Sequence, residues 1–440
     1  MIFMDKKFVS FANATNTRGM QKSKQKIFSG IFSLMALLSV GQKAMANEKP
    51  IYVVSDELFV RWRGVSEGAR DRIYRNYGAE RVWSSDMVSG LELIRLNSQK
   101  DLYATWQLLQ KEPGVIYSEP NYVQHRSAIP APKNEIQIQE TFGPYAASND
   151  PRLGEQWALV GANGMRVTQA WDKLGTLKEV KVGIIDTGID STHPDLAGRV
   201  TPGYDFIDET DVVRDVGGHG SHVAGIISAT INNGIGVAGI APNVSLIPIR
   251  AVPNEGDETD LQVIRSIEFA VLNGASIVNC SFGKDNASQA VAEAFLAAGE
   301  KGVLAVVAAG NSGANLDSTP MYPAAFHTPN MLVVGALNRS GARAYFSNFS
   351  PKLVDLFAPG AGILSTVPGG RYASYDGTSM ASPAAAGVAA LIRGMRPDMD
   401  PYQVRELMRE SVRKIESLAG ISISGGTVDA VQALEKASGL

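Results

Sequence analysis

Five apolar runs recur between residues 180 and 336 and are nearly free of polar residues. They cover residues 180–185, 244–251, 277–281, 303–308 and 331–336. Short runs of this kind are typical of strands buried on both faces of a parallel sheet. Residues 260–272 and 288–301 have the periodicity of amphipathic helices, closed by Gly274 and Gly302, and further helices are expected at 379–396, 401–411 and 429–437. The pattern predicts an α/β domain over residues 149–440, with a mostly parallel sheet flanked by helices.

Residues 51–126 form a second predicted unit. Strands are expected at 58–62, 91–96 and 115–119, and helices at 66–77 and 100–110, the first with Ser66 as its N-cap. The second helix should end at Glu112-Pro113-Gly114. The β-α-β-β-α-β order fits a small α+β domain of the ferredoxin-like type.

The segments on either side of this unit differ from it. Lys22, Lys24 and Lys26 precede an uncharged stretch over residues 27–42, and Ala44-Met45-Ala46 provides a small-x-small cleavage site. Residues 1–46 therefore read as a secretory signal peptide, which predicts export to an extracellular or periplasmic location. A membrane anchor is the alternative, but the stretch falls short of the roughly 20 apolar residues that a span needs. Residues 127–148 contain several Pro and Gly and predict an exposed linker in which processing would fall.

Composition narrows the class of partner. The net charge of the whole chain is −3, but residues 1–46 are basic, so the remainder is distinctly acidic. This balance argues against a nucleic-acid partner, which would require a basic face. Cys280 is the only cysteine, which excludes an internal disulfide and a multi-cysteine metal site. We expect a monomer stabilised by another device, for which bound calcium is the obvious candidate.

Three short motifs carry candidate catalytic chemistry. Ser379 lies in Gly377-Thr378-Ser379-Met380-Ala381-Ser382-Pro383, where a glycine turn meets the start of a buried helix. A hydroxyl there has free N–H groups beside it, which stabilise developing negative charge. Asp186 ends a buried apolar run, and His219 lies among small residues in Gly218-His219-Gly220-Ser221-His222. Serine needs a base and an orienting carboxylate to act as a nucleophile, and the chain supplies both.

These motifs, in the order Asp, His, Ser, resemble those of the subtilisin-like serine peptidases, nearest to the thermitase group. The resemblance implies that Ser379 is the nucleophile, His219 the general base and Asp186 the orienting carboxylate. Ala308-Ala309-Gly310-Asn311 resembles the oxyanion segment of the family. Asn311 and the backbone N–H of Ser379 would then donate hydrogen bonds to the oxyanion.

The unit at residues 51–126 is similar to the propeptide of the same family, whose closing motif is matched by Glu119-Pro120-Asn121-Tyr122. The resemblance implies a domain that assists folding of the catalytic domain and inhibits it until it is removed. A permanent accessory domain is the alternative.

The resemblance also implies a substrate-binding surface. Ser281-Phe282-Gly283 matches the segment that pairs with the substrate backbone as an added strand. Together with Ala309 and Gly310 it would wall the pocket for the residue before the scissile bond. Met321 stands where many relatives have a small residue, so we expect a shortened pocket that prefers modest apolar side chains to large aromatic ones.

Calcium is a second inference from the resemblance. The loop Asn232-Asn233-Gly234-Ile235-Gly236-Val237 is similar to the tight calcium loop of the family. The implied ligands are Asp150, Asp195, the side chain of Asn233 and the carbonyl groups of Thr230, Ile235 and Val237. An ordinary turn is the alternative. A second acidic segment with Asp205, Asp208, Asp211 and Asp215 resembles a weaker family site, but its other residues favour a solvated acidic loop.

Other residues near the motifs are expected to be structural. His222 and His193 are predicted to be packed, hydrogen-bonded histidines, because one imidazole suffices as the proton carrier. Cys280 lies in a buried strand and should be an inert thiol. Ala384 stands where most relatives have His, which affects packing rather than chemistry.

The sequence therefore predicts an exported, calcium-stabilised serine endopeptidase that is made as a zymogen and acts on proteins or peptides through an acyl-enzyme. A processing protease of narrow specificity is one alternative. A non-catalytic binding protein that retains the fold is another, but an intact serine, base, acid and oxyanion donor argue against it.

Overall fold

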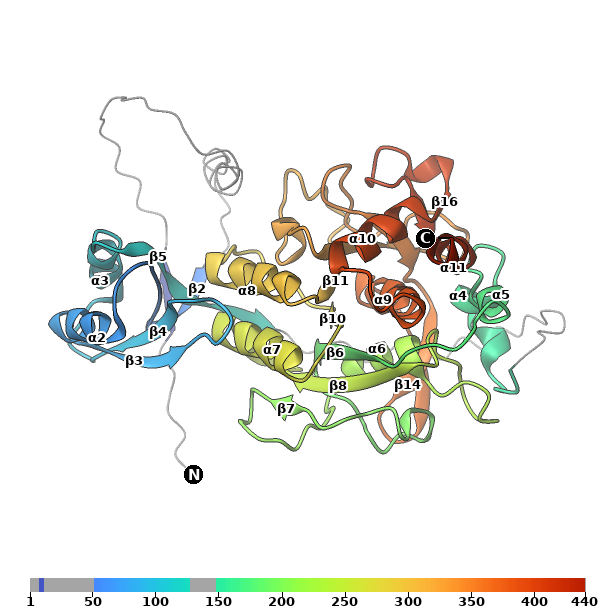
Figure 1. Cartoon of the computed structure of the whole chain (residues 1–440), viewed down its shortest axis with the longest axis horizontal. Helices are drawn as coiled ribbons and strands as arrows, with labels where there is room; N and C mark the ends of the chain where they lie inside the picture. Colours follow the sequence, from blue (N-terminus) through green and yellow to red (C-terminus); the bar gives the residue numbers. More distant parts are fainter. Residues whose placement is uncertain (1–7, 12–50, 127–147, 440) are drawn as a thin grey trace.

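The computed structural model describes residues 8–11, 51–126 and 148–439, which form a small N-terminal domain against a larger C-terminal domain (Figure 1). The predicted linker and almost all of the predicted signal peptide lie outside the described residues. The exception is β1 (Phe8–Phe11), which pairs antiparallel with the first strand of the small domain.

The N-terminal domain has the predicted β-α-β-β-α-β order. Its elements are β2 (Ile51–Trp62), α2 (Glu67–Asn76), β3 (Ala79–Ser84), β4 (Leu91–Leu96), α3 (Leu102–Leu109) and β5 (Val115–Arg126). The strands are antiparallel in the order β3-β4-β2-β5, which confirms the ferredoxin-like prediction. Ser66 lies at the N-cap of α2 as predicted, although its side chain makes no capping hydrogen bond.

The C-terminal domain is built on a nine-stranded sheet in the order β16-β17-β13-β12-β11-β10-β6-β8-β7. Every neighbouring pair is parallel except β16 with β17, which confirms the mostly parallel sheet. The strands are β6 (Val180–Asp186), β7 (Tyr204–Asp205), β8 (Val244–Arg250), β10 (Ile277–Cys280), β11 (Leu304–Ala308), β12 (Met331–Leu337), β13 (Leu356–Pro359), β16 (Val412–Lys414) and β17 (Gly426–Val428).

Helices cover both faces of this sheet. One face packs against α7 (Asp260–Leu272) and α8 (Gln289–Glu300), and the other against α6 (His219–Ser228), α9 (Thr378–Met395) and α11 (Ala430–Ser438). Successive residues of one strand feed the two cores, because Ile184 of β6 packs on the α6 and α9 side and Ile185 on the α7 and α8 side. The remaining helices are α4 (Trp157–Val160), α5 (Val167–Trp171) and α10 (Pro401–Glu410).

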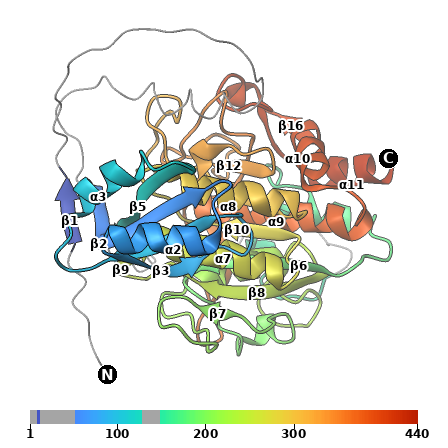
Figure 2. The same ribbon diagram turned by 60° about the vertical axis from the view of Figure 1, so that its left-hand side comes forward.

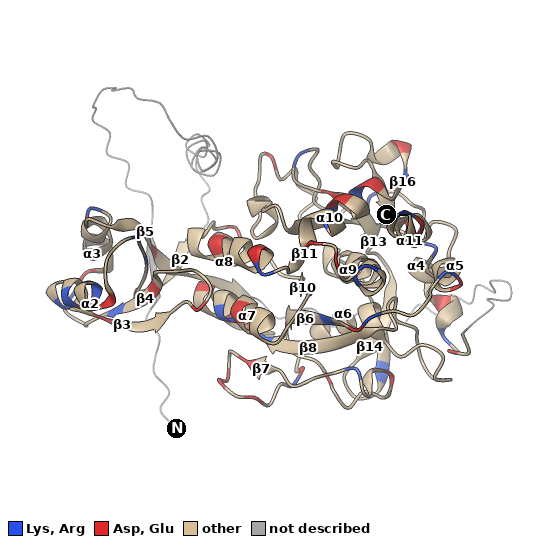
Figure 3. Ribbon diagram, in the orientation of Figure 1, with Lys and Arg blue, Asp and Glu red and all other residues tan. Residues whose placement is uncertain are grey.

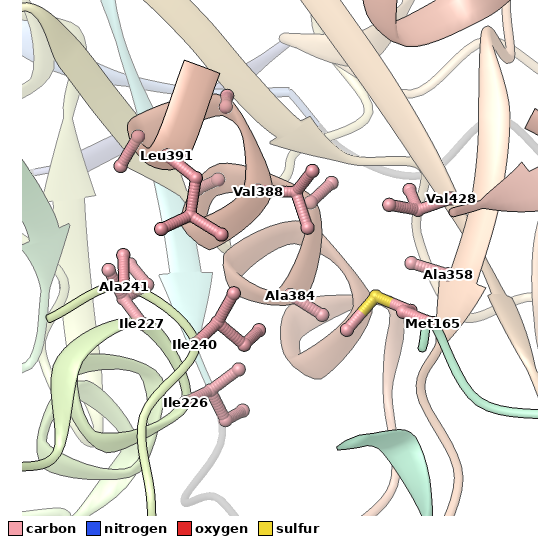
Figure 4. Packing of buried hydrophobic residues seen from close by; sticks show 14 of the residues in the cluster. Met165, Ile226, Ile227, Ile240, Ala241, Ala358, Ala384, Val388, Leu391 and Val428 are labelled. Atoms are coloured by element: carbon pink, nitrogen blue, oxygen red, sulfur yellow. The ribbon is translucent and has the colours of Figure 1, made fainter. Parts of the chain in front are cut away.

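The core around α9 depends on small side chains. Ala384 and Leu391 of α9 lie on the side of Ile226 and Ile227 of α6, whereas Val388 lies on the side of Val428 (Figure 4). Alanine-rich stretches let helices approach each other and the sheet closely. Ala384 was expected to affect packing, and it lies in a cluster that contains large aliphatic side chains. This packing holds α9 in place next to the serine motif of residues 377–383, in which the helix begins.

The two domains share a continuous structure. The sheet of the N-terminal domain carries α2 and α3 on one face and lies over α7 and α8 with the other (Figure 2). Phe59, Leu91 and Leu93 of this sheet belong to the same buried cluster as Ile264 of α7 and Val291 of α8. In addition, the end of β5 pairs antiparallel with β9 (Gly256–Thr259) of the larger domain. Both domains therefore contribute strands to the small sheet.

Some elements were absent from the expectations. The hairpin β14 (Ile363–Val367) and β15 (Arg371–Tyr375) forms a separate two-stranded sheet. Glycines lower the helix propensity of α6, and its stability comes from the burial of its residues. Within the described ranges, no helix is long and apolar enough to cross a membrane.

Candidate active site

Asp186 and His219 meet at the carboxyl end of the sheet. Asp186 is the last residue of β6 and His219 is the first residue of α6. His219 Nδ1 lies 2.7 Å from Asp186 Oδ1, which also accepts a hydrogen bond from the Thr187 N–H. The Asp186 side chain is 1% exposed and that of His219 12%. A buried carboxylate can only accept, so Nδ1 carries the proton and Nε2 is left as the base.

Ser379 lies in the first turn of α9, which packs beside α6. Its Oγ donates to the carbonyl oxygen of Ser281 at 3.2 Å. Pro383, four residues later, has no N–H to bond the Ser379 carbonyl group within the helix. The hydroxyl group of Ser281 donates to that carbonyl oxygen instead, at 3.0 Å. The backbone of Ser379 is thus fixed from the neighbouring strand.

A buried polar chain supports this contact. Asn279 of β10 donates from Nδ2 to Ser281 Oγ at 2.9 Å, and its Oδ1 accepts from Ser382 Oγ at 2.8 Å. Asn279 is fully buried. Because each polar atom of the chain has a partner, the network ties the start of α9 to the sheet in one arrangement.

Two hydrogen-bond donors border the space beside Ser379. Asn311 Oδ1 accepts from the N–H and the hydroxyl group of Thr378, both at 2.8 Å, which leaves Nδ2 as the free donor side of the amide. A Cβ atom placed on Gly377 would lie 3.5 Å from both Asn311 Nδ2 and the Ser379 nitrogen. Both nitrogen atoms therefore border one small space, as an oxyanion-binding site requires.

The segments predicted to bind substrate also come together. Residues 283 and 310 lie on either side of Met321, whose sulfur would be 2.8 Å from a Cβ on Gly283 and 2.3 Å from one on Gly310. Lys284 and Tyr322 exchange two backbone hydrogen bonds of 2.8 Å, which fix this arrangement. Ser281, Phe282 and Ala309 are buried in the same wall. The thioether of Met321 thus fills the space between the two glycines.

The residues predicted to bind calcium form one cluster. Asp195 accepts from Asn233 Nδ2 at 2.8 Å and from the Val237 N–H at 2.9 Å, and its carbonyl group accepts from the Thr230 N–H at 2.7 Å. The Ile235 N–H donates to Asn233 Oδ1 at 3.0 Å.

Asp150 binds the same loop, because its carboxylate accepts from the N–H groups of Asn232 and Asn233 at 2.8 and 3.1 Å. Asp150 and Asp195 are both buried, and within residues 51–126 and 148–439 neither forms a salt bridge with Lys or Arg. Two buried carboxylates without a cationic side chain suit an added cation. In those same ranges no three His, Cys, Asp or Glu side chains gather as a metal site, so ligation would depend on these two carboxylates and neutral oxygens.

The second acidic segment has other partners. Arg250 bonds Asp205 Oδ2 at 2.5 Å and Asp208 Oδ2 at 2.6 Å. Asp215 accepts four hydrogen bonds from neighbouring backbone and hydroxyl groups. Arginine therefore takes the place of a metal here.

The other histidines and the cysteine are packed. His222 Nε2 lies 3.0 Å from the Ala373 carbonyl oxygen, and its ring stacks on Tyr375 with centroids 4.2 Å apart. Burial lowers the pKa of His222 to about 3, so the ring is neutral. His193 is buried beside the Arg371 carbonyl group. Burial raises the pKa of the Cys280 thiol, which keeps it protonated.

Sequence reasoning missed two contributors to this site, Thr378 and Asp215, and one strand outside it, β9. Thr378 lies within the serine motif, but its hydrogen-bond acceptor, Asn311, lies 67 residues earlier in the sequence. Asp215 was considered only as part of an acidic cluster. Strand β9 is short and polar and gave no periodic signal. The spacing of Asp215 four residues before His219 was the one available clue.

Comparison with known proteins follows the same division of the chain. Residues 177–431 match the model of the subtilase family, and residues 39–121 match that of the fervidolysin N-terminal prodomain. The chain is 33% identical to the thermophilic serine proteinase of Bacillus sp. (strain AK1) over 379 residues, covering 86% of each chain.

It is also 35% identical to thermitase of Thermoactinomyces vulgaris over 287 residues, covering 65% of this chain and 99% of thermitase. Among solved structures, fervidolysin from Fervidobacterium pennivorans, described as a keratinolytic enzyme related to subtilisin, superposes with a TM-score of 0.72 at 28% identity. That match covers 87% of this chain and 61% of fervidolysin.

Proposed function

The chain belongs to the subtilase family of serine peptidases, and from this premise we propose that it is an exported endopeptidase, made as a zymogen, with Asp186, His219, Ser379 and Asn311 as its catalytic residues. The observation that carries the proposal is the meeting of a short Asp186–His219 hydrogen bond, a serine at a helix start and two convergent donors at one end of the sheet.

The chemistry follows from this arrangement. His219 Nε2 accepts the proton of Ser379 as Oγ attacks the carbonyl carbon of the scissile bond. The resulting oxyanion receives hydrogen bonds from Asn311 Nδ2 and the Ser379 N–H. Collapse of the tetrahedral intermediate expels the amine, which takes the proton from His219. Water then hydrolyses the acyl-enzyme with His219 again as base, and Asp186 stabilises the imidazolium at each stage.

The pocket suggests the substrate class. Met321 lies against Gly283 and Gly310, the glycines that would otherwise leave the pocket deep. We propose that Ser281, Phe282, Gly283, Ala309, Gly310 and Met321 bind the residue before the scissile bond. A pocket closed by a thioether accepts alanine or valine more readily than phenylalanine, because a ring would overlap the sulfur.

The N-terminal domain is proposed to be an inhibitory prodomain over residues 51–126. Glu119 accepts hydrogen bonds from Ser288 Oγ and from the Gln289 and Ala290 N–H groups at 2.8 to 3.1 Å, which satisfies the start of α8. Asn121 Oδ1 accepts from the Leu261 N–H at the start of α7 at 3.2 Å. Such contacts would help α7 and α8 to form beside each other during folding.

Calcium is proposed to bind at Asp150, Asp195, Asn233, Thr230, Ile235 and Val237. When bound, the ion would supply charge compensation for the two buried carboxylates and hold residues 230–237 against the body of the domain. It takes no part in the chemical step.

The remaining parts of the proposal concern targeting and specificity. Residues 1–46 would be a signal peptide, residues 127–148 a linker containing the processing site, and residues 149–440 the mature enzyme, acting as a monomer without nucleic-acid or membrane partners. Figure 3 fits this view, because basic and acidic residues are interspersed over the face that it shows. A processing protease of narrow specificity remains the second candidate, favoured by the restricted pocket.

The test compares residues 47–440 as wild type and as Ser379→Ala. We expect the wild type to shorten by roughly 80 to 100 residues, to cleave casein and to react with a covalent serine-directed probe. The Ser379→Ala variant should stay full length and inert. If both chains stay intact and neither reacts with the probe, the catalytic assignment fails, and a permanent accessory domain on a binding protein takes its place.

A further inference from the structure

Asp215 holds together the segments that carry two of the proposed catalytic residues. Its Oδ1 accepts from Thr187 Oγ1 at 2.8 Å, from the Gly217 N–H at 3.1 Å and from the Gly218 N–H at 2.7 Å. Its Oδ2 accepts from the Ser221 N–H at 2.8 Å. One carboxylate thus bonds the residue after Asp186 and residues on both sides of His219.

The start of α6 lacks a cap of its own. Gly218 occupies the N-cap position and has no side chain, so the first N–H groups of the helix need other acceptors. Asp215 accepts the Ser221 N–H, and Thr187 Oγ1 accepts the Gly220 N–H at 2.9 Å. The helix that begins with His219 is therefore capped jointly by the loop before it and by the strand end that bears Asp186.

The backbone segments that carry Asp186 and His219 are in direct contact, which restricts their relative movement. A Cβ on Gly220 would lie 2.0 Å from the Gly188 carbonyl oxygen, and one on Gly188 would lie 2.4 Å from the Arg214 carbonyl oxygen. Only glycine allows such an approach, so residues 186–188 and 214–220 pack main chain against main chain. The carboxylate bridges this contact at the point where the His219 ring must reach Asp186.

We propose that Asp215 is a positioning residue of the active site, which sets the distance between Asp186 and His219 and favours the imidazolium that forms during catalysis. The inference rests on the proposed roles of those two residues. It also gives a role to Asp215, which does not share the arginine partner of the acidic segment, because Arg250 bonds Asp205 and Asp208 but not Asp215.

The charge of Asp215 has a measurable consequence. The titratable groups around His219 are Asp186 on β6, Asp215 on the preceding loop, His222 on α6 and Tyr375 on β15. His222 is neutral near pH 7, as is a tyrosine whose pKa burial raises. Removal of the Asp215 charge should therefore make the imidazolium less stable and lower the pKa seen in the acid limb of kcat/KM.

The experiment uses the mature enzyme, obtained from each zymogen by wild-type protease immobilised on a resin and assayed on a peptide with alanine before the scissile bond. For Asp215→Asn we expect kcat to fall about 10- to 100-fold with KM within about 2-fold. The acid limb should move down by about half a pH unit. Asp211→Asn, which removes an exposed charge from the same loop, should leave kcat and the acid limb unchanged.

A second pair of variants guards against misfolding. Thr187→Val removes the hydroxyl that links Asp215 to the Gly220 N–H and should lower kcat, whereas Thr187→Ser keeps the hydroxyl and should restore most of the rate. Asp215→Asn with the wild-type kcat and acid limb would overturn the inference, as would equal rates for the two Thr187 variants. An inert wild-type enzyme would instead overturn the proposed function.

Discussion

Met321 illustrates how one side chain could restrict the proposed pocket, which has Gly283 and Gly310 on either side of the thioether. Its sulfur lies in the space that a Cβ on Gly283 or Gly310 would occupy. Because a methionine side chain is flexible, Met321 should disfavour large substrate side chains without excluding them completely. We therefore expect the selectivity of the proposed pocket to depend on the size of residue 321.

Met321→Gly should open this pocket. We expect kcat/KM for a peptide with phenylalanine before the scissile bond to rise about 10- to 100-fold relative to the alanine peptide, because a buried ring replaces the lost thioether. Met395→Gly, at the far end of α9, is a control for the loss of a methionine. A wild-type enzyme that already cleaves best after phenylalanine would contradict the assigned role of Met321.

Asn311 offers a test of the oxyanion site, because its two amide atoms have separate tasks. Asn311→Asp keeps an acceptor for the two Thr378 donors but loses the Nδ2 donor. We expect kcat to fall about 100- to 1000-fold with little change in KM. The thermal midpoint should stay near that of the wild type. A kcat within 10-fold of the wild type would argue against Asn311 as a donor.

At the scale of residues, the sequence predicts which residues belong to the candidate site better than it predicts the hydrogen bonds that they make. The motifs predicted Asp186, His219 and Ser379, and the structure brings the first two within hydrogen-bond distance. The contact of Ser281 with the Ser379 carbonyl group could not be predicted, because it depends on the approach of β10 to α9. For the same reason the hydrogen bond from Thr187 to Asp215 could not be predicted, whereas the other three donors to Asp215 lie within six residues of it.

At the scale of elements, the N-terminal domain adds hydrogen bonds at the starts of α7 and α8, which also have caps of their own. Glu119 caps α8 from another domain, although Ser288 also accepts from the Val291 N–H at 3.2 Å. Burial raises the pKa of Glu119 to about 7, although the Ala290 and Gln289 N–H groups oppose the shift. The contact therefore responds to pH.

The sign of this response follows from linkage. The folded-state pKa of Glu119 lies above its ordinary value of 4.5, so its contribution to stability is complete below about pH 4.5 and is lost as the pH rises toward 7. For the full-length Ser379→Ala chain we expect the free energy of unfolding in urea to fall by at most about 1.4 kcal/mol per pH unit in this window.

Glu119→Gln should flatten that pH dependence. Glu300→Gln, an exposed acid at the end of α8, should retain it. Equal slopes for the Glu119→Gln and wild-type zymogens, each with Ser379→Ala, would show that Glu119 stays ionised in the interface.

Long periodic elements were predicted well, and short ones poorly. The bounds of α7 match the prediction, and the five predicted strands are all present in the sheet. By contrast, β9, β16 and β17 are only three or four residues long and exist because partners lie beside them. Local pattern contains no information about such pairing.

At the scale of the whole molecule, we propose that stability without a disulfide is supported by calcium at the loop of residues 230–237. Asp150 and Asp195 connect this loop to the start of the domain and to the segment after β6. Calcium at 100 times its dissociation constant would stabilise the fold by roughly 2.7 kcal/mol. We expect chelation to lower the thermal midpoint of the mature Ser379→Ala chain, measured by calorimetry.

Asp195→Asn should abolish most of that calcium response, because it removes one of two anionic ligands. Asp208→Asn, in the segment held by Arg250, should preserve it. If calcium does not change the thermal midpoint of the chain with Asp195 intact, the proposed metal site is refuted.

The domain arrangement was predictable in outline. The order of elements indicated two domains and their folds, but the pattern of each domain alone gave no sign that β5 would pair with β9. Docking depends on complementary surfaces, such as Arg61 with Glu293 at 2.8 Å, that are far apart in sequence.

The pairing of β5 with β9 also bears on solubility. Once the N-terminal domain departs, β9 becomes an unpaired edge, the kind of strand through which proteins aggregate. It is only four residues long and carries Asp257 and Glu258 side by side. Two copies of this edge would bring like charges together, which would oppose self-association of the released enzyme.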